Sequence, residues 1–443
     1  MPSFSGAKKP NIVLILADDQ DVSTLPHMEA VQELLVNKGT TFTEATHSTP
    51  LCCPSRATIL RGQYVHNHGV RHNIPPSGGE RTFRLEGHDR STVATWLKSA
   101  GYRTAHFGKY LNAHNATYVP PGWDRWVAKL GGAMRPSALD VDGREVVRED
   151  VETLDVAIAD YALSHLSDIT EEQQPFYVVV SFLSPHRPFL YEERYADAFA
   201  DEPLPSPPNF NEADVSDKPS YVRERPRLTR NKIDNFTGRH RDRLRSLQTV
   251  DDAVRKIVAL LQSSGKLDDT YLFYYTDHGL NLGQHRLSGK RAPYAQAWCF
   301  PLMVRGPGVP QGVERDELVL NTDLAPTLAD LGGAEIPAFV DGRSIAPLLR
   351  GEEVPWRDAG LIEQWHDEGG RVEVPNYQAI RTTDALYVEY ETGERELYDL
   401  ANDPYQLENL YHRSADPALL DHLRSRLDAL RKCSGKQCRI AEG

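Results

Sequence analysis

The chain has 443 residues, of which 40% are hydrophobic, enough for a large buried core, and its formal net charge at pH 7 is −13. A negative charge of this size argues against nucleic acid as a general partner. No apolar segment is long enough to span a membrane, so we expect no membrane partner.

Four short apolar runs end abruptly in polar, chemically capable residues. Runs of this kind, rich in β-branched and aromatic residues, are typical of buried strands in a parallel sheet. In chain order, they are residues 11–17 before Asp18-Asp19-Gln20, 102–107 before Gly108-Lys109-Tyr110, 176–183 before Ser184-Pro185-His186, and 271–276 before Asp277-His278-Gly279.

Helical patterns separate these runs, at residues 28–38, 91–100, 151–167 and 244–264. Alternating strands and helices predict an α/β fold in which helices sandwich a large, mainly parallel sheet. Ligands bind beyond the carboxyl ends of the strands in such sheets. We therefore expect all four polar endings at one edge.

At that edge Asp18, Asp19 and Asp277 would converge. Three ionised carboxylates need a cation, because like charges raise one another's pKa values. Oxygen ligands favour Ca²⁺ or Mg²⁺, and an imidazole from His278 would widen the choice to Mn²⁺. The alternative for Asp18-Asp19 alone is a helix-capping pair at a turn.

The segment LCCPSRATILRG, around residues 52–56, combines a thiol, a proline and an arginine. Pro54 is suited to the first turn of a helix that follows the cysteine pair. The free N–H groups of that turn would attract anions and lower the pKa of a thiol, and the fork of Arg56 fits sulfate or phosphate oxygens. The segment predicts a nucleophile, Cys52, beside an oxyanion pocket; an ordinary helix start with a buried thiol is the alternative.

The motif Cys52-x-Pro54-Ser55-Arg56, followed by Leu60-Arg61-Gly62, resembles the signature of formylglycine-dependent sulfatases of the alkaline phosphatase superfamily, although the family often has Thr in place of Arg61. Further blocks resemble the family in the same order along nearly the whole chain. These are residues 10–20, 62–69, 289–291, 301–308 and 391–404.

Residues 108–112 and 120–123 resemble the N-acetylglucosamine-6-sulfatase branch of the family. Many arylsulfatases have a histidine where this chain has Leu111. The role of that histidine is then absent here or supplied by Asn112 or another group.

The resemblance implies a mechanism. A formylglycine-generating enzyme would oxidise Cys52 to an aldehyde, whose hydrated diol attacks sulfur; the second hydroxyl then expels sulfate. The resemblance implies a catalytic set of Cys52, Arg56, Lys109, His186 and Lys290, and one divalent ion, Ca²⁺ before Mg²⁺ or Mn²⁺, on Asp18, Asp19, converted Cys52, Asp277 and His278. Without the motif context, each lysine would be a surface charge and His186 a loop residue.

We therefore predict hydrolysis of a sulfate ester, on a small molecule or a sulfated sugar such as glucosamine 6-sulfate. Two alternatives stay open. One is a phosphonate or phosphate ester hydrolase of the same superfamily, encouraged by Asp277-His278. The other is an inactive protein that binds sulfated glycans.

Length alone would suggest roughly three domains, but α/β units often run longer than average. We expect a catalytic α/β domain at 1–350 and a small α+β domain at 351–443. The latter would hold a strand at 377–381, a hairpin at 386–398 turning near Thr392-Gly393, and a terminal helix at 417–432.

The compartment is left open by the sequence. The run at 11–17 is too short for a secretion signal. A disulfide between Cys433 and Cys438 would suit a secreted or periplasmic mature form, and free thiols a cytoplasmic one. The segment 218–245 carries ten Lys or Arg against three acidic residues. It could attract a polyanionic glycan or nucleic acid, but we favour a solvated loop leading into a helix.

Overall fold

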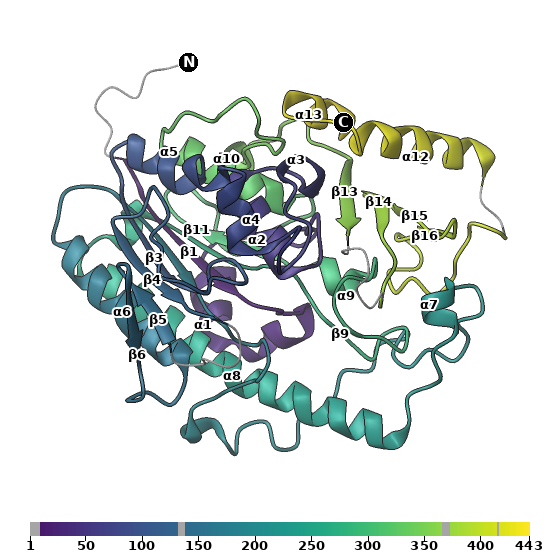
Figure 1. The fold of residues 1–443 in the computed structure, drawn as a ribbon, viewed down its shortest axis with the longest axis horizontal. Coiled ribbons are helices and arrows are strands. Elements are labelled where there is room, and N and C mark those ends of the chain that lie inside the picture. Colours follow the sequence, from purple (N-terminus) through teal and green to yellow (C-terminus); the bar gives the residue numbers. More distant parts are fainter. Residues whose placement is uncertain (1–8, 132–137, 366–372, 414–415) are drawn as a thin grey trace.

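A computed structural model describes residues 9–131, 138–365, 373–413 and 416–443 of the chain (Figure 1). Two sheets organise these residues, one of ten strands and one of four. The ten strands of the large sheet are β1 Asn11–Ala17, β2 Thr40–Phe42, β3 Arg103–Gly108, β4 Arg125–Lys129, β5 Ala138–Val141, β6 Arg144–Val147, β7 Phe176–Ser181, β8 Thr270–Thr276, β11 Leu302–Arg305 and β12 Val313–Arg315. A short ribbon pairs β9 Asn281–Leu282 with β10 Ser288–Gly289.

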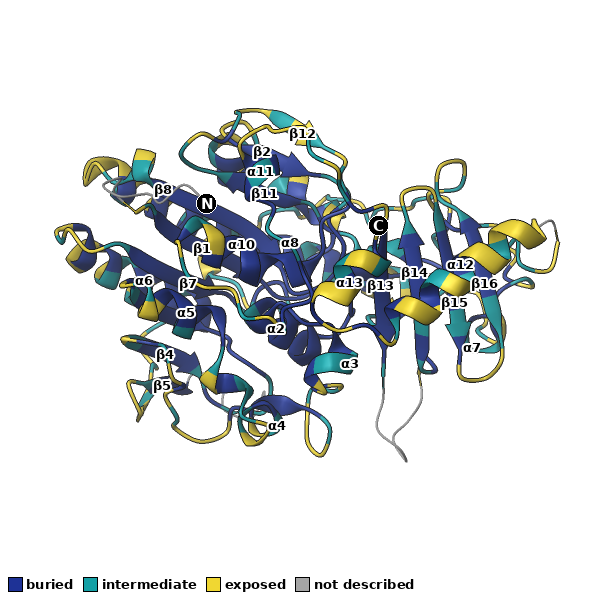
Figure 2. Ribbon diagram, turned by 90° about the horizontal axis from the view of Figure 1, so that it is seen from above, coloured by how far each residue is buried: buried dark blue, intermediate teal, exposed yellow. Residues whose placement is uncertain are grey.

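The large sheet has the order β12-β2-β11-β8-β1-β7-β3-β4-β5-β6. Its centre is parallel: β1 pairs with both β7 and β8, and β3 pairs with β7 and β4. The three central strands β1, β7 and β8 are buried along their whole length (Figure 2). The prediction of four buried parallel strands is thus confirmed, with β1 at the predicted bounds.

Helices cover both faces of this sheet (Figure 1). One layer holds α2 Cys52–Arg61, α3 Val65–His68, α4 Gly79–Leu85, α5 Val93–Ser99, α10 Leu324–Leu331 and α11 Ala346–Leu349. The other holds α1 Glu29–Val31, α6 Leu154–Thr170 and α8 Arg230–Ser263, and α8 packs against both α1 and α6. Short helical segments are η1 Val22–His27, η2 Gln32–Val36, η3 His88–Arg90, η4 Glu193–Tyr195, α7 Ser220–Arg223, η5 Leu267–Asp269, α9 Ala295–Trp298 and η6 Asn321–Asp323.

Three helix predictions need correction. The helix expected after the cysteine pair begins at Cys52 itself, with Leu51 as its N-cap, so Pro54 is its third residue. The helix expected at 28–38 is the single turn α1 followed by the π-helical turn η2. The helix expected from 244 begins at Arg230, because Phe236 and His240 give the preceding polar stretch a buried face.

The C-terminal part contains the antiparallel sheet β13 Ala359–Gln364, β14 Tyr377–Thr382, β15 Ala385–Tyr390 and β16 Arg395–Asp399, in that order. The β15–β16 hairpin turns at Gly393, whose φ of 89° suits glycine. Helix α12 Pro417–Leu430 packs on β13 and β14, followed by α13 Lys436–Ala441. The predicted sheet and terminal helix are confirmed, while a domain boundary at 350/351 stays a prediction.

Cys433 and Cys438 form a disulfide, one of the two states that the sequence left open. Among the described residues, no helix combines the length and apolar character needed to cross a membrane.

Candidate active site

The four polar strand endings meet at the carboxyl edge of the large sheet. Beyond the strands, backbone hydrogen bonds continue to join them: Asp18 N donates to Ser184 O at 3.1 Å and Lys109 N to Ser181 O at 2.8 Å. Asp277 N donates to Ala17 O at 3.3 Å. The sheet geometry therefore brings together side chains that are far apart in the sequence, such as Asp18 and Asp277, which are separated by 259 positions.

We call Asp18, Asp19, Cys52, Asp277 and His278 the active-site cluster; all are buried. Asp19 N donates to Asp277 Oδ1 at 3.1 Å, and His278 Nε2 lies 3.1 Å from Asp19 Oδ1 and 3.8 Å from Asp277 Oδ1. Cys52 Sγ lies 3.3 Å from His278 Nε2 and 3.8 Å from Asp19 Oδ1. Asp19 has a φ of 63°, a left-handed conformation of the kind that functional sites often hold.

Each carboxylate of the cluster has a cationic partner. The pairs are Lys109 Nζ with Asp18 Oδ2, Lys290 Nζ with Asp19 Oδ1 at 2.7 Å, and Arg56 Nε with Asp277 Oδ2 at 2.8 Å. Burial opposes ionisation of Asp277, but Arg56 and His278 outweigh it and hold the pKa of that carboxyl well below its ordinary value. Burial also opposes charging of His278, yet Asp277 raises the pKa of the imidazole to about 9. The carboxylates thus favour the protonated form of His278 in addition to their three cationic partners.

Cys52 sits at the start of α2 with its Sγ 2.8 Å from Lys290 Nζ. Burial would raise the pKa of its thiol, but Lys109 and Lys290 lower that pKa to about 7. The neighbouring Cys53 is equally buried, and there burial raises the pKa to about 12. Burial therefore dominates at Cys53, whereas the two lysines outweigh it at Cys52.

Arg56 is 3% exposed, and protein groups occupy most of its guanidinium. Besides its bond to Asp277, its Nη1 donates to Lys109 O at 2.8 Å and to Ser181 Oγ at 2.7 Å. Its Nη2 makes no hydrogen bond to the described residues. The expected direct role of Arg56 at a sulfate oxygen stays a prediction; the observed contacts orient Asp277.

The cluster fits a divalent cation. Asp18 Oδ1 is buried and accepts no hydrogen bond within the described part of the chain, a costly state for a carboxylate oxygen. Ligand atoms of Asp18, Asp19 and Cys52 lie within 4.8 Å of one another, as do those of Cys52, Asp277 and His278. Oxygen ligands about 2.3–2.6 Å from one Ca²⁺ ion lie roughly 3–4 Å apart, so small movements would complete such a site.

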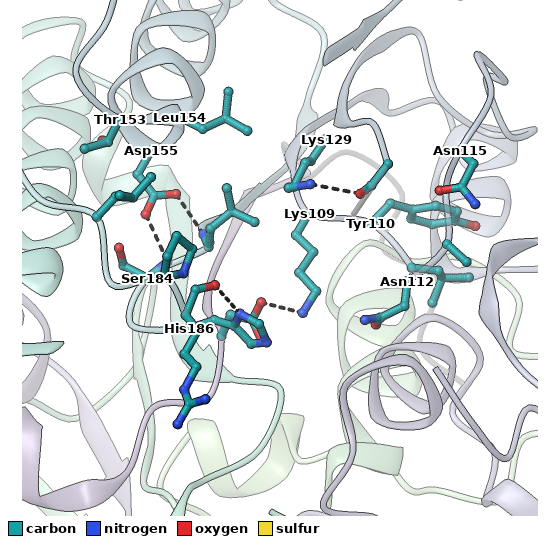
Figure 3. Close-up of a pocket in the computed structure, with 18 of the residues that line it drawn as sticks. Lys109, Tyr110, Asn112, Asn115, Lys129, Thr153, Leu154, Asp155, Ser184 and His186 are labelled. Carbon is teal, nitrogen blue, oxygen red and sulfur yellow. Dashed lines mark hydrogen bonds and ion pairs between the residues drawn. The ribbon is translucent and has the colours of Figure 1, made fainter. Parts of the chain in front are cut away.

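A cavity of about 360 Å³ opens beside the cluster (Figure 3). Asp18, Lys109 and His186 line it on the side of the cluster, with Asn112 and Lys129 among its other lining residues. Asn112 Oδ1 is buried and makes no hydrogen bond among the described groups, as suits a group that contacts a ligand. The cavity is large enough to hold a sugar-sized molecule.

His186 lies at the edge of the cluster, its Nε2 3.7 Å from Asp19 Oδ2. Its Nδ1 is 2.7 Å from Arg187 O, which can only accept, so Nδ1 carries a proton and Nε2 is the atom that can exchange one. Asp155 positions this loop by accepting from Leu183 N at 2.7 Å and Ser184 N at 2.9 Å. Asp155 was not predicted from the sequence, where it is one acidic residue of a helical pattern.

Two further supports were also missed. Arg243 of α8 is fully buried and donates from Nη2 to Asp19 O at 2.8 Å. Asn321 Nδ2 donates to Ser55 Oγ at 3.0 Å, and that hydroxyl donates to Asp277 O. The segment 218–245, expected as a solvated loop before a helix, is instead mostly the start of α8, and Lys218 is buried beside Glu212 and Asp217.

Comparison with known proteins gives consistent matches. The model of the sulfatase family matches residues 10–334, and the model of the N-sulphoglucosamine sulphohydrolase C-terminal region matches residues 283–433. N-acetylglucosamine-6-sulfatase of Capra hircus is 33% identical over 98% of this chain and 85% of its own length.

Two solved structures share the fold. A protein in complex with its substrate D-glucosamine-2-N,6-O-disulfate has a TM-score of 0.81 at 22% identity, covering 98% of this chain and 99% of its own. A phosphonate monoester hydrolase from Silicibacter pomeroyi has a TM-score of 0.72 at 22% identity, covering 94% and 93%.

Proposed function

The chain belongs to the sulfatase family of sulfuric ester hydrolases, and from this premise we propose that it removes the 6-O-sulfate from glucosamine residues of a sulfated sugar. The main support for this reaction is the position of Cys52. Its Sγ lies 2.8 Å from Lys290 Nζ, within the active-site cluster and beside a sugar-sized cavity. Support for the sugar comes from the similarity to N-acetylglucosamine-6-sulfatase along nearly the whole chain.

Membership of the family implies a divalent metal and a formylglycine in general. We propose that Asp18, Asp19, Asp277, His278 and converted Cys52 hold the ion, Ca²⁺ before Mg²⁺ or Mn²⁺. The ion would act as a Lewis acid, and the aldehyde would supply an oxygen nucleophile in place of the thiol. A formylglycine-generating enzyme would be the maturation partner.

The chain's own residues would do the rest. Lys290 and Lys109 place two ammonium groups next to Cys52, where they can hold the sulfate oxygens and balance their charge in the transition state. His186, with Nδ1–H fixed on Arg187 O, would give a proton from Nε2 to the leaving alcohol. Arg56 would hold Asp277 in place.

The second candidate is a phosphonate ester hydrolase, favoured by the imidazole of His278 in the cluster and by the shared fold. An inactive sulfated-glycan-binding protein is the third. The complete set of cluster residues and their lysine partners argues against the binding protein, since such a protein would not need the buried thiol of Cys52 beside two lysines.

The deciding experiment combines two measurements on protein from its native host. Mass spectrometry of the peptide carrying Cys52 should show an aldehyde in place of the thiol. Hydrolysis of N-acetylglucosamine 6-sulfate should exceed that of an aryl phosphonate ester. The reverse ranking would favour the phosphonate hydrolase, and tight sugar binding without sulfate release would favour the binding protein.

Metal dependence is tested separately. After dialysis against a chelator, activity should fall, and Ca²⁺ should restore it better than Mg²⁺ or Mn²⁺. Full activity in the chelated, metal-free protein would contradict a role for the ion.

We also propose that the mature chain works in an oxidising compartment, since the Cys433–Cys438 disulfide persists there. Cell fractionation would test this: recovery in the cytoplasm with both thiols free would contradict it.

A further inference from the structure

A second group of possible metal ligands lies outside the active-site cluster: His27, Glu202 and His240. His27 ends η1, Glu202 lies in the loop after η4, and His240 is on α8. One atom of each lies within 4.8 Å of the others, and His27 Nε2 is 3.6 Å from Glu202 Oε1. We propose that these three side chains bind a transition-metal ion such as Zn²⁺.

The chemistry of this ligand set differs from that of the active-site cluster. Two imidazoles and one carboxylate suit Zn²⁺, Co²⁺ or Ni²⁺ rather than Ca²⁺ or Mg²⁺, which prefer oxygen. Ligand atoms about 2.0–2.1 Å from a tetrahedral Zn²⁺ are roughly 3.3 Å apart. The side chains of His27 and Glu202 are 24% and 32% exposed, so they can make the small closing movement, and water can take the fourth position.

His240 supplies an independent indication. Its ring is 1% exposed, and its Nε2 is buried without a hydrogen bond to any described residue. A buried nitrogen in that state is costly unless something binds it.

The loop that carries Glu202 is held in place before any ion binds. Arg241 Nε donates to Glu202 O at 2.8 Å, and Arg245 Nε donates to Ala198 O at 2.8 Å. Phe199, with a φ of 58°, packs edge-on against the ring of His27 at 5.6 Å between centroids. Because two arginines of α8 fix the backbone of this loop, the Glu202 carboxylate stays beside the two histidines.

An ion at this site would join η1 to α8. Arg243, one turn after His240 on α8, donates to Asp19 O and pairs with Asp21 just before η1. The ion would therefore stabilise the segment between Asp19 and His27 without contacting the active-site cluster. We expect a higher Tm in the presence of Zn²⁺.

The test is a titration with Co²⁺ alone as the probe, followed by its visible absorption, on the full chain with Ca²⁺ in excess. The wild type should bind Co²⁺, and His240→Ala should weaken that binding at least tenfold. His422→Ala, which removes an exposed histidine of α12, is the matched control and should bind like the wild type. If His240→Ala does not fold, His27→Gln replaces it.

An Asp18→Asn variant separates this site from the active-site cluster. Co²⁺ binding that survives in Asp18→Asn and is lost in His240→Ala supports the site. Equal affinity in the wild type, His240→Ala and His27→Gln would overturn it, as would binding that only Asp18→Asn removes. None of these outcomes depends on whether the sulfated sugar has been identified correctly.

Discussion

Two buried ionic clusters of this molecule differ in whether every carboxylate oxygen accepts a hydrogen bond. We call Tyr64, Asp323, Arg343, Arg357 and Glu442 the Arg357 cluster; it joins the large sheet's helices to the C-terminal part. Arg357 Nη2 donates to Asp323 Oδ1 at 2.6 Å, and Leu320 N donates to Asp323 Oδ2 at 2.8 Å. Tyr64 OH and Arg343 Nη2 donate to the two oxygens of Glu442, at 2.7 and 3.1 Å.

Every carboxylate oxygen of the Arg357 cluster therefore has a donor, and none of its residues lines the cavity of Figure 3. The active-site cluster leaves Asp18 Oδ1 without a donor in the described structure and borders that cavity. The difference teaches that a buried charge cluster serves stability when all its carboxylate oxygens accept hydrogen bonds, and ligand binding when one of these oxygens has no donor. The predictions below test this division.

The largest effect is expected for Cys52→Ala. Loss of the nucleophile should lower kcat by about 10⁴-fold or more. Stability should change little, because Lys290 and His278 keep their contacts with Asp19. Sulfate release and thermal unfolding measure the two effects.

Cys53→Ala is the matched control for this substitution. It removes an equally buried neighbouring thiol, so activity should stay within a few-fold of the wild type. Comparable losses in the two variants would mean that helix packing, rather than a nucleophile, is being measured.

Arg357→Met should have the opposite effect to Cys52→Ala: it should lower stability and leave kcat nearly unchanged. Removing Arg357 leaves the buried Asp323 without an ion-pair partner among the described residues and leaves Glu442 with Arg343 alone. Breaking a buried pair in this way should cost about 3–5 kcal/mol of unfolding free energy. Urea denaturation measures that loss, and the kcat of the folded fraction should be nearly unchanged. Arg350→Met, which breaks an exposed pair with Glu352, is the control and should leave the unfolding midpoint unchanged. A wild-type urea midpoint for Arg357→Met would contradict the idea that the Arg357 cluster serves stability and the active-site cluster serves ligand binding.

Lys290→Ala should lower kcat by about 10²–10³-fold, the effect of losing one group that stabilises charge in a transition state. Unlike Arg357, Lys290 is partly exposed, with 19% of its side chain accessible, and we expect the folded protein to tolerate its loss. Its loss should leave the Tm within a few degrees of the wild-type value. An unchanged kcat with a large fall in Tm would place Lys290 with the structural pairs instead.

The active-site cluster could be predicted from the sequence because each residue follows a clear local signal. Asp18-Asp19 and Asp277-His278 end buried apolar strands, and the resemblance marked Cys52 and Lys290. Parallel pairing of β1 with β8 then brings these residues together, since the carboxyl ends of parallel strands share one edge.

The Arg357 cluster could not be predicted in the same way. Its members come from five separate segments, and no local pattern distinguishes a buried arginine from the exposed ones around it. Arg243 shows the same difficulty: in a stretch rich in Arg and Lys it looks like a surface charge, yet it is fully buried against Asp19. Strands β4, β5 and β6, which end the large sheet on one side, were missed because they are short and carry charged residues.

The smallest effect concerns His66, in the same region as the Arg357 cluster. Its Nδ1 lies 3.0 Å from Glu363 Oε1, and its Nε2 lies 3.0 Å from Cys433 O. Burial would lower the pKa of His66, but Glu363 outweighs it and raises that pKa to about 9. Because the folded-state pKa is above the unfolded value of about 6.5, the stabilisation is complete below pH 6.5 and is lost as the pH rises through 9.

Comparison of the wild type with His66→Gln isolates this contribution, since glutamine keeps a polar side chain that does not titrate. The difference in unfolding free energy between the two proteins should shrink by about 1–3 kcal/mol between pH 6 and pH 9.5. His422→Gln, at an exposed position of α12, should show no such change. A difference that is constant with pH would mean that His66 is neutral in the folded protein. The attachment of the C-terminal part would then depend on neutral hydrogen bonds at this point.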